Sequence, residues 1–108
     1  MQHLTDVKGT ALNKGRARVW VERSEAELKQ YGFTRGAPID VQLLDDHILI
    51  RACDDGKRKV AGREAKGKTI CIFDLGMPVE RRAEMFGGAE KLSVMVANKT
   101  IRIFAKEQ

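Results

Sequence analysis

Cysteine, histidine and long apolar runs are scarce in this chain, and each shortage excludes a class of protein. Two cysteines and two histidines among 108 residues exclude a disulfide scaffold and a cysteine-rich zinc site. Aromatic residues make up 6% of the chain, and no apolar run approaches the roughly 20 residues that cross a membrane. The N-terminal stretch MQHLTDVKGTALNKG contains no apolar core of the signal-peptide kind. We therefore expect a cytoplasmic protein that needs no metal ion or cofactor.

Sequence motifs of catalysis are also missing. The chain contains no nucleophile elbow, phosphate-binding loop, HExxH zinc motif or dinucleotide fingerprint. His47 stands beside Asp45 and Asp46 in a predicted turn, a pattern that indicates a solvated hairpin tip far more often than acid–base chemistry. Cys53 and Cys71 fall in or beside predicted strands, where a free cysteine usually serves as a small buried hydrophobe. We therefore expect that the protein is not an enzyme.

Charge is abundant in the chain, and its excess is local. Charged residues make up 32% and hydrophobic residues 43% of the chain, the mixture of one soluble globular domain. Six Lys and Arg against one Glu occupy residues 56–68, GKRKVAGREAKGK, so this segment carries the whole formal net charge of +5. Such a segment attracts polyanions and can neutralise phosphates. The alternative is a solvated, lysine-rich connector.

The chain also repeats itself after 53 positions. Residues 27–52, ELKQYGFTRGAPIDVQLLDDHILIRA, align with residues 80–105, ERRAEMFGGAEKLSVMVANKTIRIFA, without a gap. The six identical positions, most of them apolar, are Glu27/Glu80, Phe33/Phe86, Val41/Val94, Ile48/Ile101, Ile50/Ile103 and Ala52/Ala105. The stretches upstream, RVWVE and TICIFD, match approximately with a drifting offset. We infer two copies of one structural unit.

Each unit predicts a strand, a short helix and a hairpin, in that order. Ser24 and Glu27 fit a capping box that begins a helix, and Pro78 suits the first helical turn of the second unit. The hairpins turn at Asp45-Asp46 and Asn98-Lys99 between alternating apolar residues. In the first strand, one face carries Ala17, Val19 and Val21, and the other carries Arg16, Arg18, Trp20 and Glu22.

A unit of about 35–40 residues is too small to bury its own strands, so the two units must share a core. The predicted fold is mainly β with two short helices, a β-barrel or sandwich with pseudo-twofold symmetry within one chain. The domain spans residues 15–108, with repeats at 16–53 and 68–105 and a flexible arm at 1–14. A basic connector at 54–67 joins the repeats, and its residues 59–61 can form an extra short strand.

Several side chains on the outward positions of the predicted hairpins are apolar. They are Leu44, Leu49, Met95 and Phe104, with Cys71 and Phe73 on the neighbouring strand. Apolar residues on both faces are typical of a fully buried strand or of a partner interface. We favour burial under the connector and the two helices.

The order of strand, short helix, glycine turn and hairpin resembles the AbrB/SpoVT/MazE family of swapped-hairpin DNA-binding domains. In the second half, residues 78–103, PVERRAEMFGGAEKLSVMVANKTIRI, carry the resemblance. The first half, residues 20–50, WVERSEAELKQYGFTRGAPIDVQLLDDHILI, is more similar to the SymE toxin branch. Family members usually carry one unit and dimerise by interleaving hairpins. The resemblance therefore implies a duplicated AbrB-like unit that forms a pseudo-dimer within one chain, as a monomer with pseudo-twofold symmetry or as a homodimer.

The resemblance also implies which side chains contact DNA. Family members mostly use arginines of the first strand and the loop after it, which correspond here to Arg16, Arg18 and Arg23. Arginine and lysine can contact phosphates, and arginine can also reach guanine in the major groove. The second half and the connector add the candidates Lys57, Arg58, Lys59, Arg63, Lys66, Lys68, Arg81 and Arg82. Trp20 shares a strand face with Arg16 and Arg18, where it can stack on a base or contact a partner; alternatively it packs under the hairpin.

We therefore expect a small DNA-binding protein of a prokaryote or its mobile elements, a transcriptional regulator or a chromatin-like binder associated with the nucleoid. The first alternative is a protein-binding module, antitoxin-like, toxin-like or anti-defence, that grips or inhibits a protein partner. The neutral charge outside residues 56–68 and the outward apolar positions favour it. The second alternative is an RNA-cleaving toxin of the SymE type, which would depend on His47.

Overall fold

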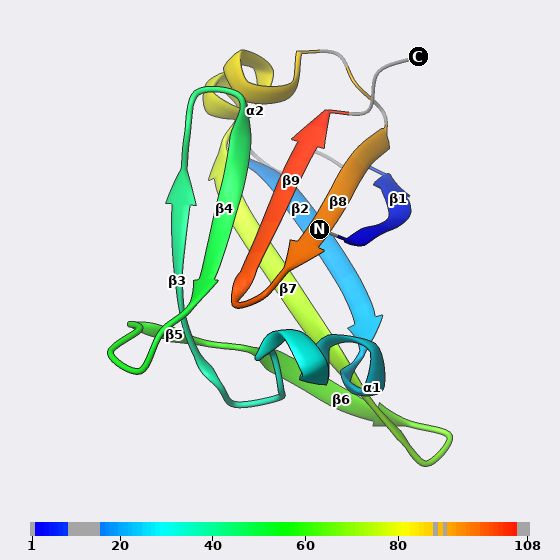
Figure 1. Ribbon diagram of the computed structural model, residues 1–108. Helices are drawn as coiled ribbons and strands as arrows, with labels where there is room; N and C mark the ends of the chain where they lie inside the picture. The colour runs from blue at the N-terminus through cyan, green and yellow to red at the C-terminus, as the bar shows by residue number, and fades with distance from the viewer. Residues whose placement is uncertain (1, 9–15, 88, 90, 106–108) are drawn as a thin grey trace.

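The computed structural model describes residues 2–8, 16–87, 89 and 91–105, and it describes side chains from residue 18 onward, Lys91 excepted (Figure 1). Most of these residues lie in two antiparallel β-sheets. The larger sheet has the strand order β1 (Gln2–Lys8), β8 (Lys91–Ala97), β9 (Thr100–Ala105), β4 (His47–Ala52), β3 (Pro38–Leu43) and β5 (Arg58–Lys59). The smaller sheet has the order β2 (Arg16–Ser24), β7 (Lys68–Pro78) and β6 (Ala61–Ala65).

Two short helices follow β2 and β7, as the repeat predicts. Helix α1 (Glu25–Leu28) runs into a 3-10 turn, η1 (Lys29–Tyr31), and α2 (Val79–Phe86) follows β7 directly. The Ser24 hydroxyl accepts a hydrogen bond from the Glu27 N–H at 3.3 Å, which confirms half of the predicted capping box. Within the residues that the structure describes, no helix has the length and apolar character to cross a membrane.

The core lies between the two sheets, where the alternating apolar side chains of both point inward. Val19 and Val21 of β2 face the core together with Cys71, Phe73, Leu75 and Met77 of β7. The larger sheet contributes Ile48, Ile50, Val94, Val96, Ile101 and Ile103. Helix α1 adds Leu28 and helix α2 adds Met85 and Phe86, and the helices lie near opposite ends of the molecule in Figure 1. A mainly β fold with two short helices is thus confirmed. No ladder joins the two sheets in the described residues, so the barrel alternative is wrong.

The strand register relates the two units to each other. Leu49 and Arg102, 53 positions apart, are paired directly between β4 and β9, with Ile48 opposite Ile103 and Ile50 opposite Ile101. The repeated isoleucines therefore cross-pair. In the smaller sheet, Trp20 of β2 is opposite Asp74 of β7, and equal numbers of residues pair on either side of that point.

The outer edges of the two hairpins are also paired at equivalent positions. Strand β5, just before the second unit, pairs with β3 of the first unit at Pro38 and Ile39. Strand β1, before the first unit, pairs with β8 of the second unit at Lys91 and Leu92, each 53 positions further along. Each hairpin is thus extended at the same place by the segment that leads into the other unit.

The expected arm and the expected connector both contain strands, and the sequence predicts one short strand in the connector, at residues 59–61. Gln2–Lys8 form β1, whereas the rest of the expected arm, residues 1 and 9–14, lies outside the described residues. The connector holds β5 and β6 with Val60 between them, only 2% exposed. Position 56, just before β5, requires a glycine, because a Cβ there would lie 2.5 Å from the Ile39 nitrogen. Burial of Val60 fixes the middle of the basic stretch to the domain.

The expected outward apolar positions divide into two groups. The expectation that Cys71 and Phe73 face outward is wrong, because the register of β7 turns both into the core. Phe73 contacts Phe33 there, edge to face, with 6.1 Å between the ring centroids. Leu49 faces outward yet is only 9% exposed, and Phe104 stacks on His47 with 4.6 Å between ring centroids. Phe104 is therefore partly covered by His47 of the neighbouring strand, and Leu49 is buried although it faces away from the core.

Candidate nucleic-acid interface

The basic segment, residues 56–68, forms β5, β6, the turn between β6 and β7, and the first residue of β7. β5 and β6 run along one end of the molecule, the lower edge in Figure 1. Its six cationic side chains, Lys57, Arg58, Lys59, Arg63, Lys66 and Lys68, are all exposed. The structure therefore places these six cations along one accessible end of the fold.

The six cations differ in how far their charge is compensated. The Arg63 guanidinium lies 3.2 Å from a Glu22 carboxylate oxygen, and Arg58 donates to the Asp74 carbonyl at 3.2 Å. The four lysines have no carboxylate within 4 Å in the described part of the chain. These lysines are the charges that a polyanion can reach without breaking an ion pair.

The end of the smaller sheet projects as a two-stranded ribbon. Pairing of β2 with β7 stops at Ile70, but β6 and β7 continue to the pair Ala65–Lys68. The turn uses Lys66 and Gly67, with φ of 51° and 75°. Two positive φ angles in a two-residue turn match the right-handed twist of the strands. The basic segment thus ends in a tight hairpin that carries Lys66 and Lys68.

Arg18, on the first strand, is paired instead. Its Nε and Nη2 donate to the two Asp74 carboxylate oxygens at 2.8 and 2.6 Å. These hydrogen bonds hold the pKa of Asp74 below its usual value. The guanidinium carbon also lies 4.9 Å from the centre of the Trp20 ring. Arg18 therefore has its bidentate edge occupied within the chain.

Trp20 lies on the outward face of the smaller sheet and is half-buried. Its indole N–H donates to a Glu22 carboxylate oxygen at 2.8 Å, which is the main cause of the lowered pKa of Glu22. Arg18 lies over the ring, and Glu22 in turn contacts Arg63. Trp20 therefore lies on the outward face and not under the hairpin, and its role in stacking on a base or contacting a partner stays a prediction.

The remaining arginines of the expected DNA contact are dispersed. Arg81 donates to the carbonyls of Leu43 and Leu44 at 2.9 and 2.8 Å, so it fastens the β3–β4 hairpin to α2. Arg82 is half-buried, and its Nε has no partner in the described residues. Arg23 donates to the Glu22 carbonyl at 2.6 Å. The side chain of Arg16 lies outside the described residues.

Arg35 joins the candidate set although sequence reasoning missed it. Its guanidinium lies 3.6 Å from the Glu64 carboxylate of β6, and Thr69 of β7 donates to the same carboxylate at 2.8 Å. The one acidic side chain of the basic segment is therefore partly neutralised. No sequence signal indicates this contact, because Arg35 lies in a loop 29 positions from its partner.

A cleft lies between α1 and the end of the ribbon. Its volume is about 380 Å³, and it is lined by Ser24, Glu25, Ala26, Lys29, Gly67, Lys68 and Thr69. Glu25 is held there by the Arg35 N–H at 2.9 Å. Its carboxylate beside two lysines makes the cleft mixed in charge, so the cations at the ribbon tip are better placed for an anion than the cleft itself.

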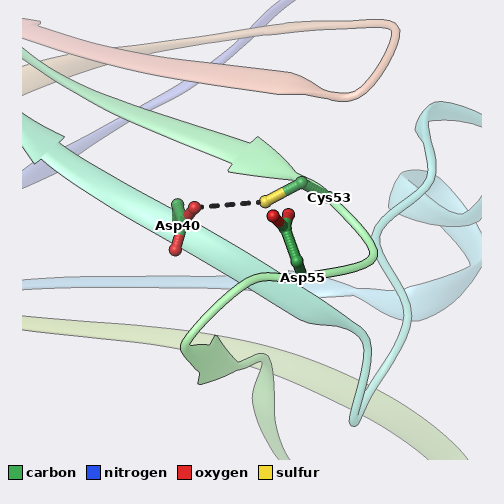
Figure 2. A group of neighbouring side chains, drawn as sticks. All are labelled: Asp40, Cys53 and Asp55. Carbon is green, nitrogen blue, oxygen red and sulfur yellow. Dashed lines mark hydrogen bonds between the residues drawn. The ribbon is translucent and has the colours of Figure 1, made fainter.

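Asp40, Cys53 and Asp55 form a separate cluster (Figure 2), in which one carboxylate oxygen of each aspartate and the Cys53 sulfur lie within 4.8 Å of one another. The Cys53 thiol donates to Asp40 at 3.4 Å, and the Lys57 N–H donates to the other Asp40 oxygen at 3.1 Å. The backbone hydrogen bond lowers the pKa of Asp40, whereas burial and then the carboxylates raise the pKa of Cys53. These contacts order the loop before β5.

His47 has both ring nitrogens engaged. Arg102 lies 2.8 Å from Nε2 and can only donate, so Nδ1 carries the proton and donates to Asp46 at 2.7 Å. The side chain is 13% exposed and stacks on Phe104. This geometry leaves the imidazole without a free nitrogen for acid–base work.

Comparison of the chain with protein-family models, with curated proteins and with solved structures found no match. We therefore infer a function from the chain's own residues.

Proposed function

We propose that this protein binds nucleic acid by contacting phosphates with the lysines of its basic segment. The observation that carries the proposal is that Lys57, Lys59, Lys66 and Lys68 are exposed at one end of the fold and have no ion pair in the described residues. Phosphate contacts of this kind position a protein on DNA without reading its sequence. A chromatin-like binder fits this arrangement better than a regulator that recognises one operator.

The paired state of Arg18 supports moving the proposed contact from the first strand to the basic segment. A phosphate that bound the Arg18 guanidinium would have to replace two short hydrogen bonds to Asp74. A phosphate that binds Lys59 or Lys66 replaces only water. The free-energy balance therefore favours the lysines.

We also propose that the two halves are a duplicated swapped-hairpin unit, as the resemblance to the AbrB/SpoVT/MazE family implies. The support is the register: Leu49 pairs with its own equivalent, Arg102, and β1 and β5 extend the two hairpins at equivalent positions. Under this proposal the single chain supplies both halves of what two chains supply elsewhere in the family.

A matched pair of double variants tests the binding proposal. Lys57→Gln/Lys59→Gln removes two charges from the basic segment, and Arg51→Gln/Lys99→Asn removes the same net charge from exposed positions outside it. Affinity for a fluorescent duplex of ~30 base pairs is measured by anisotropy at three salt concentrations, because each phosphate contact contributes about −0.9 to the log–log slope. We expect the first variant to reduce the slope by about 1.8 and the second to leave it unchanged. Equal slopes for the two variants would contradict the proposal.

A protein-binding function is the second candidate, and one observation favours it. Leu43, at the end of β3, is 37% exposed, and Arg81 fixes the backbone that presents it. Leu43→Asp should then abolish capture of a partner while leaving duplex affinity unchanged. An RNA-cleaving toxin receives less support, because the ring nitrogens of His47 are both bonded.

A further inference from the structure

We propose that the β6–β7 ribbon, residues 64–69, enters the major groove of a duplex, so that the ligand of the basic segment is double-stranded rather than single-stranded. This inference rests on the proposed function and assigns its contact to one element. Its support comes from the shape of the ribbon, its charge and the absence of a stacking surface in the basic segment.

The shape of the ribbon suits a groove. Beyond Ile70, β7 has only β6 as a strand partner, because β2 has already ended. Helix α1 lies across the cleft from one side of the ribbon. The turn extends past α1 in Figure 1. The B-DNA major groove is about 12 Å wide and admits a two-stranded β-ribbon. The side chains at the tip are compact apart from its lysines, with Ala65 before the turn and Gly67 within it.

The charge of the ribbon suits a path between two phosphate backbones. Lys66 and Lys68 lie at its tip with exposed side chains and no carboxylate within 4 Å in the described part of the chain. The only acidic residue of the ribbon, Glu64, is occupied by Thr69 and Arg35. Apart from Glu25, which lines the cleft beside Lys68, the tip therefore enters a negative potential with little opposing charge.

The aromatic side chains argue against a single strand as ligand. Proteins that bind single strands stack bases on exposed aromatic rings beside a cationic groove. The basic segment contains no aromatic residue. The one indole on the same sheet, Trp20, has Arg18 over its ring and its N–H bonded to Glu22. Lysines without a stacking platform are suited to the regular phosphates of a duplex.

Two lysines in matched turns provide the test. Lys66 in the ribbon and Lys99 in the β8–β9 turn both have left-handed backbone, with φ of 51° and 59°. Asparagine tolerates this conformation, so Lys66→Asn and Lys99→Asn each remove one charge and keep the turn. We expect Lys66→Asn to reduce the salt slope for a duplex by about 0.9, and Lys99→Asn to leave it unchanged.

A charge-neutral variant separates the shape of the ribbon from its charge. Gly67 has φ of 75°, and no described residue lies within 4 Å of where its Cβ would be, so Gly67→Val strains the turn without a clash among those residues. Gly87→Val strains the end of α2 in the same way and serves as the control. With folding verified by thermal melting, Gly67→Val should weaken duplex binding although every lysine remains. The wild-type protein should protect guanine N7, a major-groove atom, from methylation.

The possible outcomes distinguish the two proposals. If the wild-type protein binds no duplex even at low salt, the proposed function fails. If it binds a duplex but Lys66→Asn matches Lys99→Asn and Gly67→Val matches Gly87→Val, only the ribbon assignment fails. Equal affinity for a single strand of the same length would also overturn the assignment.

Discussion

The outward face of the smaller sheet and the basic segment both carry arginine or lysine, but they hold that charge in different ways. On the sheet face, Arg18 is bonded to Asp74, and Arg63 reaches across from β6 to Glu22. In the basic segment, the four lysines lack such partners in the described residues. The difference teaches that the charge available to a partner depends on strand register as well as on composition.

Among changes that test this comparison, breaking the Arg18–Asp74 pair should produce the largest change in duplex affinity. It leaves the sheet face with an unpaired cation, as in the basic segment. In Asp74→Asn the guanidinium loses its charged partner while the strand pairing between β2 and β7 remains. We expect tighter duplex binding and a salt slope steeper by about 0.9, since one more cation becomes available. The measurement is anisotropy over the same salt series. Unchanged binding would mean that the sheet face does not meet the duplex even when its charge is free.

We expect a smaller effect of acid on the melting temperature, because low pH protonates Asp74 and weakens its pair with Arg18. The hydrogen bonds from Arg18 hold the pKa of Asp74 below its usual value, so the pair stabilises the fold at pH above about 4. This contribution is lost as pH falls through the lowered pKa of the folded state. The difference in melting temperature between wild type and Asp74→Asn should therefore shrink below about pH 4. A difference that stays constant down to pH 2 would contradict the pairing.

The smallest effect concerns Trp20, the only tryptophan in the chain. Because its N–H is bonded to Glu22 and Arg18 lies over its ring, we expect saturating duplex to leave its fluorescence nearly unchanged. A base stacked on the indole would quench the emission strongly. Strong quenching would restore the sequence-based interpretation of Trp20 as a stacking residue.

The stability of the fold at alkaline pH tests the burial of Cys71 in the core behind the sheet. Burial, with a smaller effect from Glu25, raises the pKa of Cys71 to about 11. The unfolded thiol loses its proton at lower pH, so the thiol stabilises the fold below its usual pKa and this contribution is lost toward pH 11. Wild type should therefore lose more melting temperature than Cys71→Val between about pH 8 and 11. Parallel losses in the two proteins would show that Cys71 is more accessible than its position in β7 indicates.

Much of the fold follows from the sequence because local periodicity sets strand faces. The alternation of Val19 and Val21 and the capping residues Ser24 and Glu27 placed β2 and α1 correctly. The repeat also indicated that Ile48 and Ile101 occupy equivalent positions, and both are buried in the shared core. These features depend on neighbours within a few residues, which a single sequence displays.

The candidate site was only partly predictable, because its details depend on residues brought together from distant positions. Alternation places Arg18 on the outward face, but only the register of β2 against β7 brings Asp74 beside it, 56 positions away. The contacts between Arg35 and Glu64, and between Cys53 and Asp40, arise in the same way. The basic segment was predictable as charge, whereas the ribbon that presents its tip required the pairing of β6 with β7.

The most direct measurement is the salt dependence of wild-type binding to a random duplex of ~30 base pairs. If the four lysines of the basic segment contact phosphates, the log–log slope should be about −3.6, with the tightest binding at the lowest salt. A slope near zero, or no binding at ~50 mM salt, would contradict the central claim, because non-specific affinity for phosphates is greatest under those conditions.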